Sequence, residues 1–258
     1  MNMKTKYISL SVWAVLLALT MTSCDGLLNQ PPYDDFTDEE YWQNEDQART
    51  YMYGFYTSVF SGYGTGTSHG PFLMGQTLND DFASDVEQKD LTPLVVPEAD
   101  GSWSFSNIRK ANYALASIDR IDATPAVKNH WRGVARFFRA CYYSNLVFRY
   151  GDVPWYDRVP RLSDSKEDMD YLYKDRDPRA FVDSCIMADF QYAMDSVREN
   201  DGPQQINRYV VAAMVSRFML REGTFLKYHN IDTKLAEQCL TMAKDASEMV
   251  MKSNKYAI

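Results

Sequence analysis

The 258-residue sequence lacks the residue groupings that most enzyme active sites require. It has three histidines, far apart in the chain, and no HExxH, GxSxG or phosphate-loop motif. These absences argue against zinc peptidases, α/β-type serine hydrolases and P-loop nucleotidases. The 35 acidic residues allow a glycosidase-like carboxylate pair, but no spacing singles one out, so this alternative is unsupported. We therefore expect a protein that is not an enzyme, with no catalytic residue, no metal and no cofactor.

Basic residues are in the minority, and long hydrophobic runs are scarce. Lys and Arg number 27 against 35 Asp and Glu, which gives a formal net charge of -8. An acidic chain is a poor match for nucleic acid or for anionic lipid headgroups, so we expect no nucleic-acid partner. The apolar run from Ile8 to Leu19 is too short to span a bilayer, which takes about 20 residues.

This apolar run has the surroundings of a secretion signal. Lys4 and Lys6 precede it, and the short sequence Met21-Thr22-Ser23-Cys24 follows it. Cys24 falls where a bacterial lipoprotein is cut and acylated, so we expect a lipoprotein signal peptide at 1–23 and lipidation of Cys24. The alternative is an ordinary signal peptide, cleaved nearby, that leaves a secreted protein.

Three further cysteines, Cys141, Cys185 and Cys239, lie in helical patterns with apolar neighbours. They lack the CxxC spacing of a metal site. Buried free thiols are the favoured interpretation, and one disulfide in an oxidising compartment is the alternative.

Apolar residues at helical spacing predict a mainly α fold. The strongest stripe includes Trp131, Val134 and Phe138, and Gly151 ends it. Successive helices pair as hairpins, which predicts stacked tetratricopeptide-like units. The other expected helices run from a Thr37 cap, with Glu40 at its third position, to Gly62; from Ser104 to Ile121; from an Asp177 cap to Val197; from an Asn207 cap to Gly223; and from Thr233 to Ser253, with 157–176 as a polar linker.

The segment from Ser61 to Ser102 is rich in Gly and Pro and shows no period. Irregular segments of this length are often functional, and Tyr63 and Trp103 lie at its edges. Trp103 is a platform for a sugar ring or, alternatively, a staple at the start of a helix. The segment also holds the acidic residues Asp80, Asp81, Asp85 and Glu87, for which a solvated loop is favoured over a calcium site.

Three arginines, Arg132, Arg136 and Arg139, share one face of the helix before Gly151. Arginine pairs well with carboxylates in partly buried settings. We favour a salt-bridged flank to neighbouring helices over an anion-binding site.

Several stretches match a known pattern. They are Cys24-Asp25, Pro31-Pro32, Thr37 to Trp42, Leu78 to Asp81, Trp103 with Ile108, Ala111 and Asn112, Gly133 to Ala140, Tyr142-Tyr143, Gly151 to Pro154, Ala213 to Leu220, Glu222 to Thr224 and Lys227 to His229. They resemble the N-terminal half of the SusD/RagB-like outer-membrane lipoproteins of Bacteroidetes. The most specific are Gly133 to Ala140 and Gly151 to Pro154.

The resemblance implies a lipid-anchored protein at the cell surface of the outer membrane. It implies that the protein binds a glycan or another nutrient and delivers it to a SusC-like, TonB-dependent transporter. It suggests Tyr63, Asp81, Trp103 and Asn107 as ligand-binding residues. Family members are usually much longer, so we expect the helical domain at 24–258 to be incomplete at its C-terminus. The alternative function is a helical-repeat adaptor that binds no ligand.

Overall fold

The computed structural model describes residues 41–60, 102–160 and 165–256. These residues are mainly helical, as predicted, and their only β feature is an isolated bridge between Val153 and Asp177. The helices are α4 (Glu45–Tyr53), α5 (Tyr56–Val59), α7 (Ser106–Ser117), α8 (Pro125–Tyr150), α9 (Lys166–Leu172), α10 (Arg179–Ser196), α11 (Arg208–Tyr228) and α12 (Thr233–Lys252), with a 3-10 turn at Ile118–Arg120.

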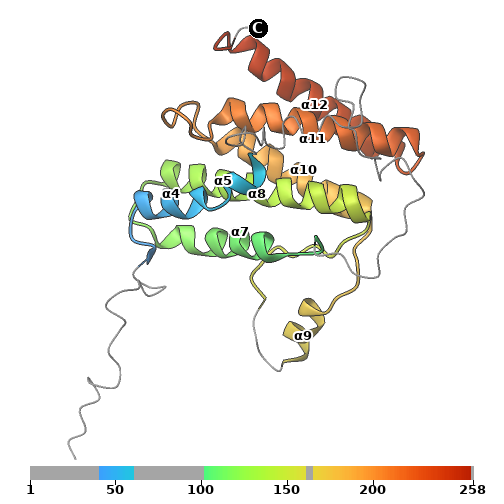
Figure 1. Ribbon diagram of the computed structural model, residues 1–258, viewed down its shortest axis with the longest axis horizontal. Coiled ribbons are helices and arrows are strands. Elements are labelled where there is room, and N and C mark those ends of the chain that lie inside the picture. Colours follow the sequence, from blue (N-terminus) through green and yellow to red (C-terminus); the bar gives the residue numbers. More distant parts are fainter. Residues whose placement is uncertain (1–40, 61–101, 161–164, 257–258) are drawn as a thin grey trace, which may run out of the picture. The chain divides into compact units, whose positions relative to one another are not determined.

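The long helices stack in the order of the chain, as Figure 1 shows. α7 packs on α8, α8 on α10, α10 on α11, and α11 on α12. The hairpins α7–α8 and α11–α12 confirm the predicted tetratricopeptide-like stacking. Aromatic rings fill the layers between helices: Phe55 stacks on Phe138 at 5.0 Å, and Phe137 lies 6.4 Å from Phe190.

Helix α8 is the centre of the stack and follows its sequence signals closely. Thr124 caps it by accepting a hydrogen bond from the N–H of Val127, and Pro125 occupies the first helical position. Gly151 ends it with a positive φ of 73°, a conformation that favours glycine. Trp131, Val134 and Phe138 are all buried, so the predicted stripe is confirmed.

The single helix predicted before Gly62 is wrong in detail, because the structure has two shorter helices there. α4 begins after Asn44, whose side chain accepts the N–H of Gln47, while the Gln47 side chain accepts the N–H of Asn44. Gly54 and Phe55 then separate α4 from α5. The predicted cap at Thr37 and Glu40 lies outside the described residues.

The predicted cap of α10 is also wrong. The carboxylate of Asp177 accepts the N–H of Trp155 at 2.6 Å and is therefore engaged elsewhere. The N–H of Arg179 instead donates to Asp152 at 2.8 Å. A residue in the turn after α8 thus caps α10, and the two helices are joined through that turn.

Gly223 does not end α11, which continues to Tyr228. A β-carbon at Gly223 would lie 2.8 Å from Cγ of Leu240 and 3.1 Å from the carbonyl oxygen of Ala236. Both atoms belong to α12, so glycine is needed at this position for close helix packing rather than for a helix end.

The supposed polar linker at 157–176 contains helix α9. The Ser165 side chain caps this helix by accepting the N–H of Asp168. The short length of α9 explains why apolar periodicity does not reveal it.

Cys141 and Cys239 are buried and Cys185 is half-buried, and all three are free thiols, as favoured from the sequence. Among the residues that the structure describes, no helix combines the length and the apolar character that crossing a bilayer requires.

Candidate functional site

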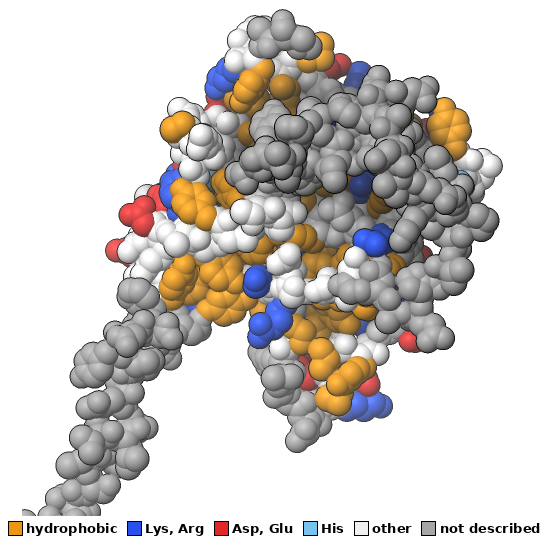
Figure 2. Space-filling model, in the orientation of Figure 1, with side chains coloured by type: hydrophobic (Ala, Val, Ile, Leu, Met, Phe, Trp, Pro, Cys, Tyr) orange, Lys and Arg blue, Asp and Glu red, His pale blue; other side chains and the backbone are white. Residues whose placement is uncertain are grey.

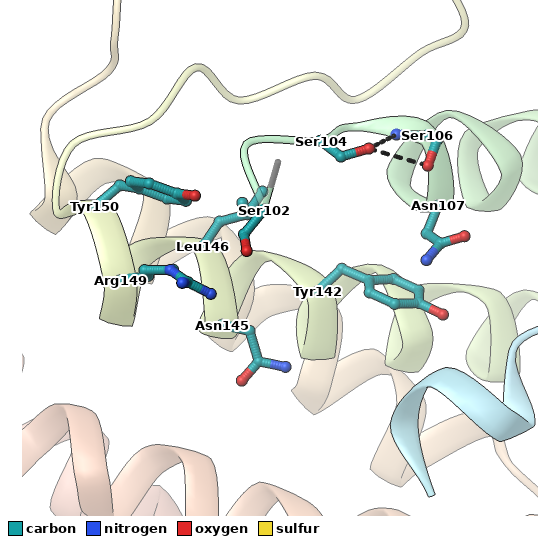
Figure 3. Close-up of a pocket in the computed structure, with 9 residues that line it drawn as sticks. All are labelled: Ser102, Ser104, Ser106, Asn107, Tyr142, Asn145, Leu146, Arg149 and Tyr150. Atoms are coloured by element: carbon teal, nitrogen blue, oxygen red, sulfur yellow. Dashed lines mark hydrogen bonds between the residues drawn. The ribbon is translucent and has the colours of Figure 1, made fainter. Parts of the chain in front are cut away.

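A hollow of about 220 Å³ lies between the start of α7 and the second half of α8. Figure 3 shows Asn107 projecting from α7 over Tyr142 of α8. Most of the lining side chains carry hydroxyl, amide or guanidinium groups, so the hollow offers both donors and acceptors. The lining residues are Ser102, Ser104, Ser106, Asn107, Tyr142, Asn145, Leu146, Arg149 and Tyr150.

Local hydrogen bonds hold the α7 side of the hollow in place. The Ser104 hydroxyl accepts the N–H of Ser106 at 3.4 Å and lies 3.1 Å from the Ser106 hydroxyl. On the α8 side, the phenol of Tyr142 shares a short hydrogen bond with Ser58. Burial raises the pKa of Tyr142, so this phenol stays neutral at physiological pH.

Trp103 stands next to this hollow, immediately before α7. Its ring meets Tyr150 edge-on at 4.9 Å and Phe105 at 5.3 Å. The guanidinium of Arg176 lies 4.7 Å from the centre of the Trp103 ring. The side chain remains 37% exposed, so part of its surface is open to a ligand.

The structure brings two of the sequence-predicted ligand residues to one place, because Asn107 lines the hollow and Trp103 contacts Tyr150 at its edge. Tyr63 and Asp81 lie outside the described residues, as do Cys24 and the acidic residues around Asp81. Within the described ranges, no group of three or more His, Cys, Asp or Glu side chains is placed to hold a metal ion.

Three lining residues of α8 were missed from the sequence. At helical spacing, Tyr142, Asn145 and Arg149 continue the same face as Trp131, Val134 and Phe138 toward the end of α8. On this face Tyr142 belongs to the apolar stripe, which usually indicates core packing. That the end of this face lines a hollow becomes visible only when the start of α7 is placed beside it.

The arginines earlier in α8 form the predicted salt-bridged flank. Arg132 pairs with Asp119, and Arg136 lies 3.7 Å from Asp189. Arg139 makes a bidentate pair with Asp189 at 2.7 and 2.9 Å, with both side chains buried. These contacts fasten α8 to the turn before it and to α10.

Arg139 also holds α7, the helix whose start borders the hollow, against the chain that follows α8. It donates to the side-chain oxygen of Asn112 on α7 at 2.7 Å. The Asn112 amide in turn donates to the carbonyl of Tyr156 at 2.8 Å, and the Tyr143 hydroxyl accepts the N–H of Tyr156 at 2.6 Å. The chain after α8 is thereby held against α7.

This arrangement forms a second hollow, of about 270 Å³, on another side of the start of α7. It is more apolar than the first and shares Ser106 with it. Its lining residues are Phe105, Ser106, Ile108, Arg109, Asn112, Tyr156, Arg158, Pro160 and Leu172.

No protein-family model matches the chain, but the similar proteins and structures described next are all SusD-like. The chain is 22% identical over 209 residues to the SusD-like protein P38 of Formosa agariphila, a match that covers 74% of this chain and 40% of the relative. A SusD-like protein of Bacteroides fragilis has a similar structure, with a TM-score of 0.59 and 20% identity over 89% of this chain and 42% of the other. A SusD-like carbohydrate binding protein of Bacteroides vulgatus gives a TM-score of 0.51 and 18% identity, over 84% of this chain and 46% of the other.

The chain spans less than half the length of each of these three relatives. The two solved structures show that the helical fold is shared, and the sequence match to the Formosa protein agrees with them. By sequence similarity and fold together, the chain resembles SusD-like proteins.

Proposed function

We propose that this chain is the glycan-binding component of a lipid-anchored outer-membrane importer, and that it captures oligosaccharide at the hollow beside Trp103. The observation that carries the proposal is a polar hollow bordered by a partly exposed tryptophan on a SusD-like fold. One solved protein with this fold is itself a carbohydrate binding protein.

The residues of the hollow suit a sugar. An exposed aromatic ring such as Trp103 stacks on the apolar face of a pyranose, while the amides of Asn107 and Asn145 bond to its hydroxyls. The described lining contains no Asp or Glu, so no carboxylate there is available as a general acid or base. This composition supports binding without turnover.

The site residues Tyr63 and Asp81 belong to the same proposal and are expected to extend the ligand surface. We further propose a signal peptide at 1–23, a lipid on Cys24 and a helical domain over 24–258. The delivery partner is a SusC-like, TonB-dependent transporter in the outer membrane. The signal-like N-terminal sequence and the family support this arrangement.

Isothermal titration of the purified chain against a panel of oligosaccharides tests the binding site. Trp103→Ala should weaken binding of the best ligand about tenfold, the equivalent of about 1.4 kcal/mol, because the stacking platform is lost. Tyr228→Ala is the matched control, since Tyr228 is an exposed aromatic on α11 that lines neither hollow. Full affinity in Trp103→Ala would move the site elsewhere, and failure of the wild-type chain to bind any saccharide would favour the adaptor.

Purification from native outer membranes in mild detergent tests the partner and the anchor. A TonB-dependent barrel should co-purify with the chain, and intact-mass analysis should find acyl groups that Cys24→Ser lacks. Without a barrel the importer is refuted, and without acyl groups the lipid anchor is refuted.

A further inference from the structure

We infer that the oligosaccharide bound at this site is anionic, and that arginines around the start of α7 recognise its carboxylate or sulfate groups. The inference rests on the proposed function and specifies the ligand class. It comes from the charge of the two hollows that share Ser106.

Both hollows have basic residues and no acidic residue in the part of their lining that the structure describes. Arg149 lines the first hollow, and Arg109 and Arg158 line the second. Acidic residues outnumber basic ones in the whole chain, 35 to 27, so this local balance is opposite to the overall one. Figure 2 shows basic side chains beside a hydrophobic patch over the start of α7.

Two of the arginines near the site pair with no carboxylate among the residues that the structure describes. Neither Arg109 nor Arg176 forms an ion pair with any residue in the described ranges, and both are exposed. Most of the other arginines among the described residues do pair with carboxylates. These are Arg49, Arg132, Arg136, Arg139, Arg158, Arg179, Arg198 and Arg208.

The two arginines without a carboxylate partner lie where a ligand would reach them. Arg176 packs over the ring of Trp103, and Arg109 lines the second hollow one turn into α7. A sugar stacked near Trp103 would therefore have a guanidinium within reach of its substituents. The Arg158–Glu167 pair, at 3.8 Å between two exposed side chains, is too weak to neutralise Arg158.

Guanidinium chemistry selects the ligand class. Its planar fork of N–H donors matches the paired oxygens of a carboxylate or a sulfate and forms two parallel hydrogen bonds. A neutral sugar hydroxyl gains much less from such a donor. The inferred ligand is thus a uronic acid-containing or sulfated oligosaccharide.

Matched probes that differ only in charge test the inference. Titration calorimetry would compare oligogalacturonate with its methyl ester, and sulfated with unsulfated dextran oligosaccharides. In at least one pair we expect the charged member to bind ten or more times more tightly. This preference should shrink as salt is raised, because exposed charges are screened.

Two arginine variants test which residues cause the preference for the charged oligosaccharide. Arg109→Gln and Arg176→Gln should each reduce the ratio of the affinity for the charged ligand to that for the neutral ligand several-fold. Arg217→Gln is the matched control, because Arg217 is an exposed arginine of α11 that lines neither hollow, and it should keep the wild-type ratio.

The outcomes separate the two proposals. Equal affinity for charged and neutral members would overturn the anionic class while glycan binding stands. A preference that survives both arginine variants would overturn the assignment to these residues. A chain that binds no member of either pair, and nothing in the wider oligosaccharide panel, would refute both proposals.

Discussion

Replacing His130 by asparagine should remove a loss of stability that the fold suffers below neutral pH. His130 is fully buried in α8, where its Nδ1 accepts the N–H of Arg198 at 3.2 Å. Its Nε2 lies 3.6 Å from a carboxylate oxygen of Asp201. Burial, reinforced by the charge of Arg198, lowers the pKa of His130 from 6.5 to about 4.

The direction and size of the effect follow from this pKa. Between pH 6.5 and 4 the unfolded chain binds a proton at His130 that the folded chain does not, so the free energy of unfolding falls as pH falls. From pH 7 to pH 5 the loss amounts to about 2 kcal/mol, at 1.36 kcal/mol per pKa unit. The pKa values of Glu45 and Asp201 are lowered, so these carboxylates lose their contribution only below this window.

Urea unfolding at pH 7 and pH 5 measures the effect. Asparagine keeps an acceptor for the Arg198 N–H but does not titrate. The wild-type chain should therefore lose about 2 kcal/mol more than His130→Asn between the two pH values. His229→Asn, at an exposed position beyond α11, is the control and should behave as wild type. Equal losses in the wild type and His130→Asn would refute the reasoning.

Three further predictions concern the packing of the helices. Both carboxylate oxygens of Asp183 are buried without a hydrogen-bond donor, and burial raises the pKa of Asp183. Asp183→Asn should therefore be more stable than wild type at pH 8 in urea unfolding, and this difference in stability should shrink toward pH 4. A difference that grows toward pH 4 would contradict this. Gly223→Ala should lower the free energy of unfolding by about 1–3 kcal/mol, because the clash with Leu240 exceeds the gain in helix propensity; an increase in Tm in calorimetry would show that α12 can move away. Arg139→Ala should cost about 3–5 kcal/mol in chemical denaturation, because it leaves the buried carboxylate of Asp189 unpaired; a loss below 1 kcal/mol would mean that water replaces the guanidinium.

Sequence reasoning succeeded where the signal is local. Thr124, Pro125 and Gly151 set the ends of α8 through contacts within a few residues, so their meaning can be read from the chain. It failed where the decisive partner is distant. Asp177 has the composition of a helix cap, but its carboxylate is engaged by Trp155, which only the folded turn brings near.

The candidate site divides in the same way. Trp103 and Asn107 could be nominated because the family resemblance points to the irregular segment and the residues that follow it. Tyr142 instead belongs to the apolar stripe of α8, and its place in the hollow becomes visible only with α7 beside it. The glycine at 223 was misread for a related reason. Its role depends on the distance between two helices, which composition does not encode.

The network around Arg139 has a consequence for how a ligand would be received. One guanidinium joins α8 to α10 through Asp189 and to α7 through Asn112, and the Asn112 amide continues to the chain after α8. The helices that line both hollows are therefore held in place by hydrogen bonds before a ligand binds. A preorganised site loses little conformational entropy on binding a ligand, so the contacts with the ligand contribute more of their free energy to the affinity.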